Sequence, residues 1–156
     1  MFVVECRTEV TLVTCLTSVS KKRVTHASGR SRVIRQLLKN YENSVGMVDE
    51  DPNATHSHDM QRFSEIEFSK RDAIRILCHN QRNNCLIVLC PRLEEWIIEA
   101  SREANIDLNR YNLPNDPEGL HEIINIKIDK FQQLVEKLMK KSNRVRALRN
   151  HLRSKT

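Results

Sequence analysis

The sequence predicts an α/β protein, with a mostly parallel sheet flanked by helices and a helical extension at the C-terminus. Short β-prone runs at residues 2–4, 23–25 and 45–48 alternate with helical patterns inside the first half of the chain. That alternation implies right-handed crossovers between parallel strands. Beyond residue 91 the pattern changes to successive amphipathic segments, which predict helices.

The first two strands and the helix between them come at the start of the chain. Residues 2–4 are apolar and β-prone, and Glu5 ends the run. Residues 8–19 place apolar side chains at helix spacing, although their threonines and valines leave a strand as the competing interpretation. A short strand is expected at residues 23–25.

A second helix and a central strand follow. The helix opens after Gly29 and can be capped by Ser28 or Ser31. The strand at residues 45–48 ends abruptly in Asp49-Glu50-Asp51. An apolar run of this length between polar residues suits a strand buried on both faces. If the strand continues past Asp49, its two aspartates point the same way and the glutamate between them points opposite.

The middle of the chain predicts a long loop and a hairpin. Residues 52–69 are polar and should form a loop beside the sheet, with a brief strand at residues 65–68. Residues 73–78 and 85–90 flank a polar turn, which is typical of a β-hairpin. Because the second run is apolar throughout, we expect it at the centre of the sheet.

Helix signals dominate the remaining sequence. Pro91 suits the first position of a helix that runs to about Ala104. Asp116, followed by proline and an acid, marks another helix start. Residues 128–141 have one apolar face, and Ser142 can cap a last helix after them.

Length and composition indicate how many domains the chain forms and in which cellular compartment we expect it. With 156 residues, 29% of them charged and 39% apolar, the chain fits one globular unit. We expect residues 1–104 to form the α/β domain and residues 105–156 to form a helical extension packed on it. No apolar run reaches the roughly 18 residues that span a bilayer, and an acid at Glu5 does not suit a signal peptide. We therefore expect a cytoplasmic protein without a membrane partner.

Charge and cysteine content give further expectations. The net charge of +6 favours an anionic partner such as nucleic acid, and a homo-oligomer or a protein partner stays open. Five cysteines in apolar segments are expected as buried reduced thiols rather than disulfides, and their spacing does not match a zinc site. They are Cys6, Cys15, Cys78, Cys85 and Cys90.

The acidic strand ends carry a family resemblance. A strand ending in Glu5 and a later one ending in Asp49-Glu50-Asp51, joined by βαβ connections, resemble the Toprim domain of topoisomerases, primases and related nucleases. The resemblance covers roughly residues 1–100. It implies a Toprim-like, or Rossmann-like, sheet in which Glu5, Asp49 and Asp51 hold Mg²⁺ for phosphoryl transfer.

The sequence departs from the Toprim pattern at two positions, and a later helix start adds to the resemblance. Cys6 stands where the family usually has glycine, and the further acid that often closes its motif is missing after Pro52. The helix start that contains Glu94 and Glu95 looks like that of Toprim-like nucleases of the overcoming-lysogenization-defect type and of small phage-defence proteins. The resemblance therefore lets Glu94 or Glu95 supply an outer carboxylate, whereas the helix dipole is the favoured explanation of their place in a first helical turn.

The metal site also has a physical basis. Mg²⁺ prefers hard oxygen ligands, and the carboxyl ends of strands form the ligand crevice of open α/β sheets. The competing interpretation is that Asp49 and Asp51 merely end a strand and face solvent. His56 and His58, in the loop beside these acids, would suit Mn²⁺ or proton transfer.

Basic residues suggest where phosphate would bind. Arg30 and Arg32 stand at a helix start, where they can hold phosphate oxygens beside free N–H groups, or can simply be solvated. Arginines near the C-terminus can track a nucleic-acid backbone or form a solvated face.

Together these features predict Mg²⁺-dependent phosphodiester chemistry on nucleic acid, most simply a nuclease and therefore a hydrolase. Glu5, Asp49 and Asp51 would be the catalytic metal ligands, Glu5 also a general base, and Arg30 a phosphate clamp. The alternative is a non-catalytic, degenerate Toprim scaffold that acts as an interaction subunit of a defence or repair complex.

Overall fold

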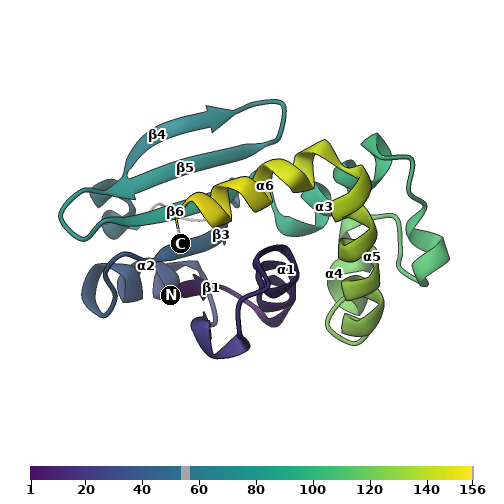
Figure 1. Ribbon diagram of the computed structural model, residues 1–156, viewed down its shortest axis with the longest axis horizontal. Helices are drawn as coiled ribbons and strands as arrows, with labels where there is room; N and C mark the ends of the chain where they lie inside the picture. Colours follow the sequence, from purple (N-terminus) through teal and green to yellow (C-terminus); the bar gives the residue numbers. More distant parts are fainter. Residues whose placement is uncertain (54–56, 156) are drawn as a thin grey trace.

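The computed structural model describes residues 1–53 and 57–155, and its centre is one mixed sheet (Figure 1). Within these residues the sheet has six strands in the order β2-β1-β3-β6-β5-β4. The strands are β1 Phe2–Val4, β2 Val24–His26, β3 Val45–Asp49, β4 Ser64–Ser69, β5 Ile74–His79 and β6 Asn84–Leu89. The predicted α/β class with a mostly parallel sheet is confirmed.

Strand direction sets which ends of the strands meet. β1, β2, β3 and β6 run parallel, whereas β5 and β4 add to the sheet in antiparallel fashion. Phe2 is paired with Val45, and Val45 with Cys85, so the strands are in close register. Their carboxyl ends therefore lie along one edge of the sheet. The predicted hairpin is confirmed, and its second strand, β6, lies between β3 and β5 with every residue buried.

Helices and short 3₁₀ turns make up most of the remaining described chain. The α-helices are α1 Arg7–Thr17, α2 Arg30–Lys39, α3 Leu93–Glu103, α4 Pro117–Ile123, α5 Ile128–Lys141 and α6 Asn143–Ser154. The 3₁₀ turns are η1 Lys21–Arg23, η2 His58–Arg62 and η3 Leu108–Tyr111. Residues 8–19 were expected to form a helix, with a strand as the alternative, and the helix is confirmed as α1. The helix expected at residues 128–141 has the predicted bounds. Among the described residues, no helix is both long and apolar enough to cross a bilayer.

The two faces of the sheet are covered unequally. Helices α1, α3, α5 and α6 share one apolar core with the sheet (Figure 1), and α6 packs on the other three helices. Trp96 of α3 is fully buried there, and its indole N–H donates to the carbonyl of Asp72 at 2.8 Å. The opposite face packs mainly on α2. There Gly46 of β3 lets α2 approach, because a Cβ atom at Gly46 would lie 2.6 Å from Leu37 Cδ1.

Two predicted helix starts are wrong and two are confirmed. The N-cap of α2 is Gly29, and no side chain caps it, so neither Ser28 nor Ser31 has that role. Pro91 precedes α3 rather than opening it, because Arg92 is the N-cap of that helix. The other two starts are as predicted: the side chains of Asp116 and Ser142 accept hydrogen bonds from Gly119 N and Val145 N.

The cysteine prediction is wrong for one pair. Cys78 of β5 and Cys85 of β6 face each other across the hairpin, with Cα atoms 4.1 Å apart, and they form a disulfide. Residue spacing alone does not reveal which positions of a hairpin are opposite, because register depends on the turn. Cys6, Cys15 and Cys90 are free thiols, as expected, but they are half-buried rather than buried.

Candidate functional site

The two predicted strand-end acids Glu5 and Asp49 lie side by side. Glu5 directly follows β1, and Asp49 is the last residue of the parallel neighbour β3. Glu5 Oε1 accepts a hydrogen bond from the Asp49 backbone N–H at 2.9 Å. The structure therefore brings together two acids that are 44 positions apart in the sequence.

Asp49 lies where charge is poorly tolerated. Its Oδ1 accepts a hydrogen bond from the backbone N–H of Leu93, the first residue of α3, at 2.9 Å. Burial, and after it the nearby carboxylates of Glu5 and Glu94, raises the pKa of Asp49 to about 8. With this pKa the carboxyl of Asp49 is mostly protonated at neutral pH, and its ionised form is destabilised by its surroundings.

A third acid, Glu9, lies close to Glu5 and Asp49. Its side chain in α1 is almost fully buried, and Oε2 accepts hydrogen bonds from Glu5 N at 2.5 Å and Cys6 N at 3.0 Å. Burial and the neighbouring charges of Asp49 and Glu5 raise its pKa well above the usual value. Glu9 thus fixes the turn that presents Glu5.

The sequence interpretation missed Glu9, although a signal for it exists. An acid at the third position of a helix, reaching back to the N–H of the N-cap, is half of a capping box. In this chain the N-cap is Cys6 rather than serine or threonine, so the usual pattern is incomplete.

Two substitutions at Glu9 separate the contribution of its hydrogen bonds to stability from the contribution of its charge. Glu9→Ala leaves two partly buried N–H groups without an acceptor and should lower the free energy of unfolding by about 2 kcal/mol or more. Glu9→Gln keeps an acceptor oxygen and resembles the protonated acid, so we expect it to be at least as stable as the wild type. Urea denaturation of both variants measures this difference, and equal losses would show that the charge of Glu9 is what matters.

Glu94 and Glu95 differ in their surroundings, which sequence alone did not separate. Glu94 is buried, raises the pKa of Asp49, and has its Oε1 2.8 Å from Nδ1 of His121 in α4. Glu95 is instead paired with Arg92 at the start of α3. We call Glu5, Glu9, Asp49 and Glu94 the acidic cluster.

Asp51 lies apart from this arrangement. β3 ends at Asp49, and Asp51 has a positive φ of 41°, so the extended geometry that would align the two aspartates is not present. The Asp51 N–H donates to the carbonyl of Pro91 at 3.0 Å, and its Oδ1 accepts from Asn53 N at 3.3 Å. Asp51 nevertheless lies near enough to raise the pKa of Glu5.

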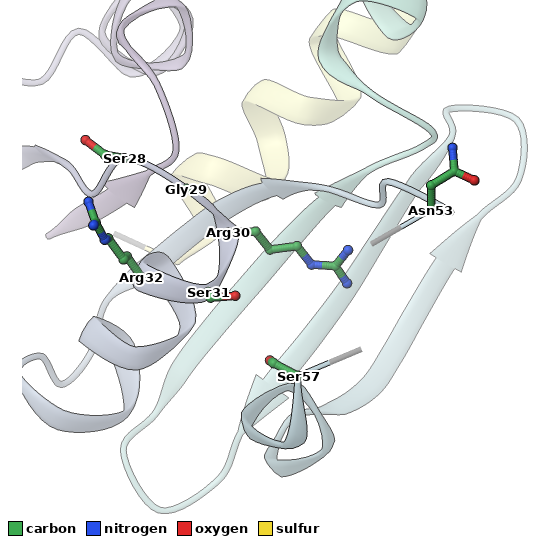
Figure 2. A pocket seen from close by; sticks show the side chains of 7 residues that line it. All are labelled: Ser28, Gly29, Arg30, Ser31, Arg32, Asn53 and Ser57. Atoms are coloured by element: carbon green, nitrogen blue, oxygen red, sulfur yellow. The ribbon is translucent and has the colours of Figure 1, made fainter. Parts of the chain in front are cut away.

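The basic residues at the start of α2 border this acidic edge. A cavity of about 520 Å³ lies there, and it is lined by Ser28, Gly29, Arg30, Ser31, Arg32, Asn53 and Ser57. Figure 2 shows the Arg30 side chain extended toward the side of Asn53 and Ser57, whereas Arg32 turns back toward Ser28. The two arginines therefore reach different parts of the cavity.

Arg30 connects the cavity to the acidic cluster. Its guanidinium donates to the carbonyl of Glu50, the residue that follows β3. The backbone N–H and the positive charge of Arg30 both favour the charged form of Glu5, but burial outweighs them and the pKa of Glu5 is raised. Glu5 is therefore the member of the acidic cluster that lies beside the N-terminal end of α2.

Of the two loop histidines, only His58 lies among the described residues. His58 is exposed at the start of η2, and His56 lies outside the described residues. Across residues 1–53 and 57–155, no group of three or more His, Cys, Asp or Glu side chains is arranged to hold a metal ion.

No protein-family model, curated protein or solved structure matches this chain.

Proposed function

We propose that the protein carries out Mg²⁺-dependent phosphodiester chemistry on nucleic acid, most simply cleavage, at the carboxyl edge of its parallel strands. The observation that carries this proposal is the juxtaposition of Glu5 and Asp49, with Glu5 Oε1 2.9 Å from Asp49 N. Ligand sites of open α/β sheets lie at such an edge.

The donor set suits Mg²⁺. The ion is commonly held by one or two carboxylates together with substrate phosphates and water, so the lack of a ready three-residue group among the described residues is compatible with it. The raised pKa of Asp49 supports the same proposal, because a divalent cation would offset the repulsion among these carboxylates. Glu5 and Asp49 would be the protein ligands, and Asp51 an outer acid that acts through water.

The remaining roles follow from position. Bound Mg²⁺ would supply polarisation of the phosphodiester and a lowered pKa for water. Arg30, beside Glu5, would clamp a phosphate oxygen, and Arg32 would hold a second phosphate in the same cavity. Glu5 would also accept the proton of the attacking water.

A non-catalytic interaction module is the second candidate. It is favoured by the position of Asp51, which is turned away from Asp49 by a positive φ of 41°. In that case the acidic edge would be a degenerate Toprim-like scaffold that serves a defence or repair complex.

A cleavage assay separates the two candidates. We expect the purified protein to cleave at least one of single- and double-stranded DNA and RNA in Mg²⁺ or Mn²⁺, and none of them in EDTA. An Asp49→Ala, Asp51→Ala variant should be inactive on the same substrates. Cleavage by both proteins alike, or by neither, would favour the interaction module.

A further inference from the structure

An exposed aromatic ring lies on the strand at the far side of the sheet. Phe68 of β4 is 45% exposed and is paired with Arg75 of β5. The guanidinium carbon of Arg75 lies over the Phe68 ring, 4.0 Å from its centroid. One face of the ring is thus covered by a cation, and the ring still offers a large accessible area.

Two carboxylates hold Arg75 in place. Its Nε donates to Glu50 Oε2 at 3.1 Å, and its Nη1 donates to Glu65 Oε2 at 2.9 Å. Glu50 follows Asp49 directly in the sequence. The arginine over Phe68 is therefore fixed relative to the acidic edge rather than free to swing away.

The strand register places this pair at the same edge as the acidic cluster. Ile74, the first residue of β5, is opposite Leu89, the last residue of β6, and Cys90 N donates to the carbonyl of Ala73 at 3.0 Å. The β4–β5 turn consequently lies beside the carboxyl ends of the parallel strands. Two exposed cations, Lys70 and Arg71, stand in that turn.

A second cavity connects Arg75, the cation over Phe68, to Arg30. It measures about 500 Å³, and its lining includes Arg30, Asp51, Glu65 and Arg75. Arg30 also lines the cavity at the start of α2. Phe68 does not line this cavity, but Arg75, which does, lies against its ring, so a chain of nucleotides held by Arg30 could continue past Arg75 to Phe68.

We propose that Phe68, backed by Arg75, is a stacking platform for an unpaired nucleobase, and that the substrate is single-stranded nucleic acid. Every base has a π-face that can stack on an aromatic ring, whereas the bases of a duplex already stack on one another. The cations of the turn would track the backbone on one side and Arg30 on the other. This proposal rests on the proposed function, from which it takes the class of substrate.

A tryptophan at position 68 gives a direct readout. The natural Trp96 is fully buried and supplies a constant background, so Phe68→Trp adds an exposed fluorophore that a stacked base should quench. The probes are a single-stranded oligothymidylate and an abasic phosphodiester oligomer of equal length, both in EDTA so that cleavage is prevented. Ile66→Trp is the matched control, because Ile66 is also exposed on β4, at 57%.

The expected result has two parts. Oligothymidylate should quench the Phe68→Trp variant saturably and leave the Ile66→Trp variant unchanged, and the abasic oligomer should quench neither. Phe68→Ala should weaken oligothymidylate binding about tenfold, and Ile66→Ala should not change it.

Three results would overturn the platform: no binding of oligothymidylate by the wild type, equal affinity for both oligomers, or equal losses in Phe68→Ala and Ile66→Ala. Equal losses would instead indicate that the β4 edge receives another strand. Base-dependent binding without any cleavage in Mg²⁺ would uphold the platform and contradict only the proposed function.

Discussion

Asp49→Asn is expected to stabilise the protein at pH 8 by on the order of 3 kcal/mol. Asparagine keeps an oxygen that can accept the Leu93 N–H, and it removes a charge that burial and neighbouring carboxylates disfavour. For a chain of this length the gain corresponds to an increase in melting temperature of about 8 °C.

The gain should depend on pH in a defined direction. Asp49 has a pKa of about 8 in the folded protein and an ordinary aspartate pKa of 3.8 as its reference. Between these values the folded form binds more protons than the unfolded form, so wild-type stability falls as pH rises from about 4 to about 8. The raised pKa values of Glu5 and Glu9 act in the same direction.

Thermal unfolding of the wild type and Asp49→Asn across pH 4.5 to about 8.5 measures this effect. We expect nearly equal melting temperatures at the acidic end and a widening difference above it. Glu42→Gln is the control, because Glu42 is exposed and its ion pair with Arg82 is long, at 3.7 Å. A pH-independent difference would contradict the raised pKa of Asp49.

Mg²⁺ should stabilise the wild type at pH 8 and not the Glu5→Gln variant. A ligand at about ten times its dissociation constant adds about 1.4 kcal/mol to the free energy of unfolding, or about 4 °C in melting temperature for this size. The physical reason is that the ion offsets repulsion between Glu5 and Asp49, which the uncharged glutamine already relieves in part.

Thermal shifts measured with increasing MgCl₂ at constant ionic strength test this expectation. Because surface charges respond to salt alone, the same titration with NaCl is the reference. Equal Mg²⁺ shifts in the wild type and in Glu5→Gln would mean that the cation binds elsewhere.

Much of the fold was predictable because its signals are local. The apolar runs of β1, β3 and β6, the hairpin, and the caps at Asp116 and Ser142 each follow from neighbouring residues. The alternation of strands and helices then determined that the strands run parallel. Parallel strands place Glu5 and Asp49 at the same edge of the sheet, but the two acids meet only because β1 and β3 are also neighbours in it.

What was not predictable depends on long-range geometry or on a single backbone angle. The turn at Asp51 depends on a positive φ, which an aspartate adopts only when its surroundings favour it. The Cys78–Cys85 disulfide depends on the register of the hairpin. The burial of Glu94 beside Asp49 requires the position of α3 against the sheet, which no local pattern encodes.

The most direct test of the acidic edge is cleavage by Glu5→Gln beside Glu42→Gln, at equal protein concentration in Mg²⁺ and with folding checked by circular dichroism. The variants make the same chemical change, one at the proposed site and one on the surface. We expect Glu42→Gln to cleave at the wild-type rate and Glu5→Gln to be slower by at least about a hundredfold. Equal rates for the two variants would contradict the assignment of Glu5 and Asp49 as the metal-binding pair.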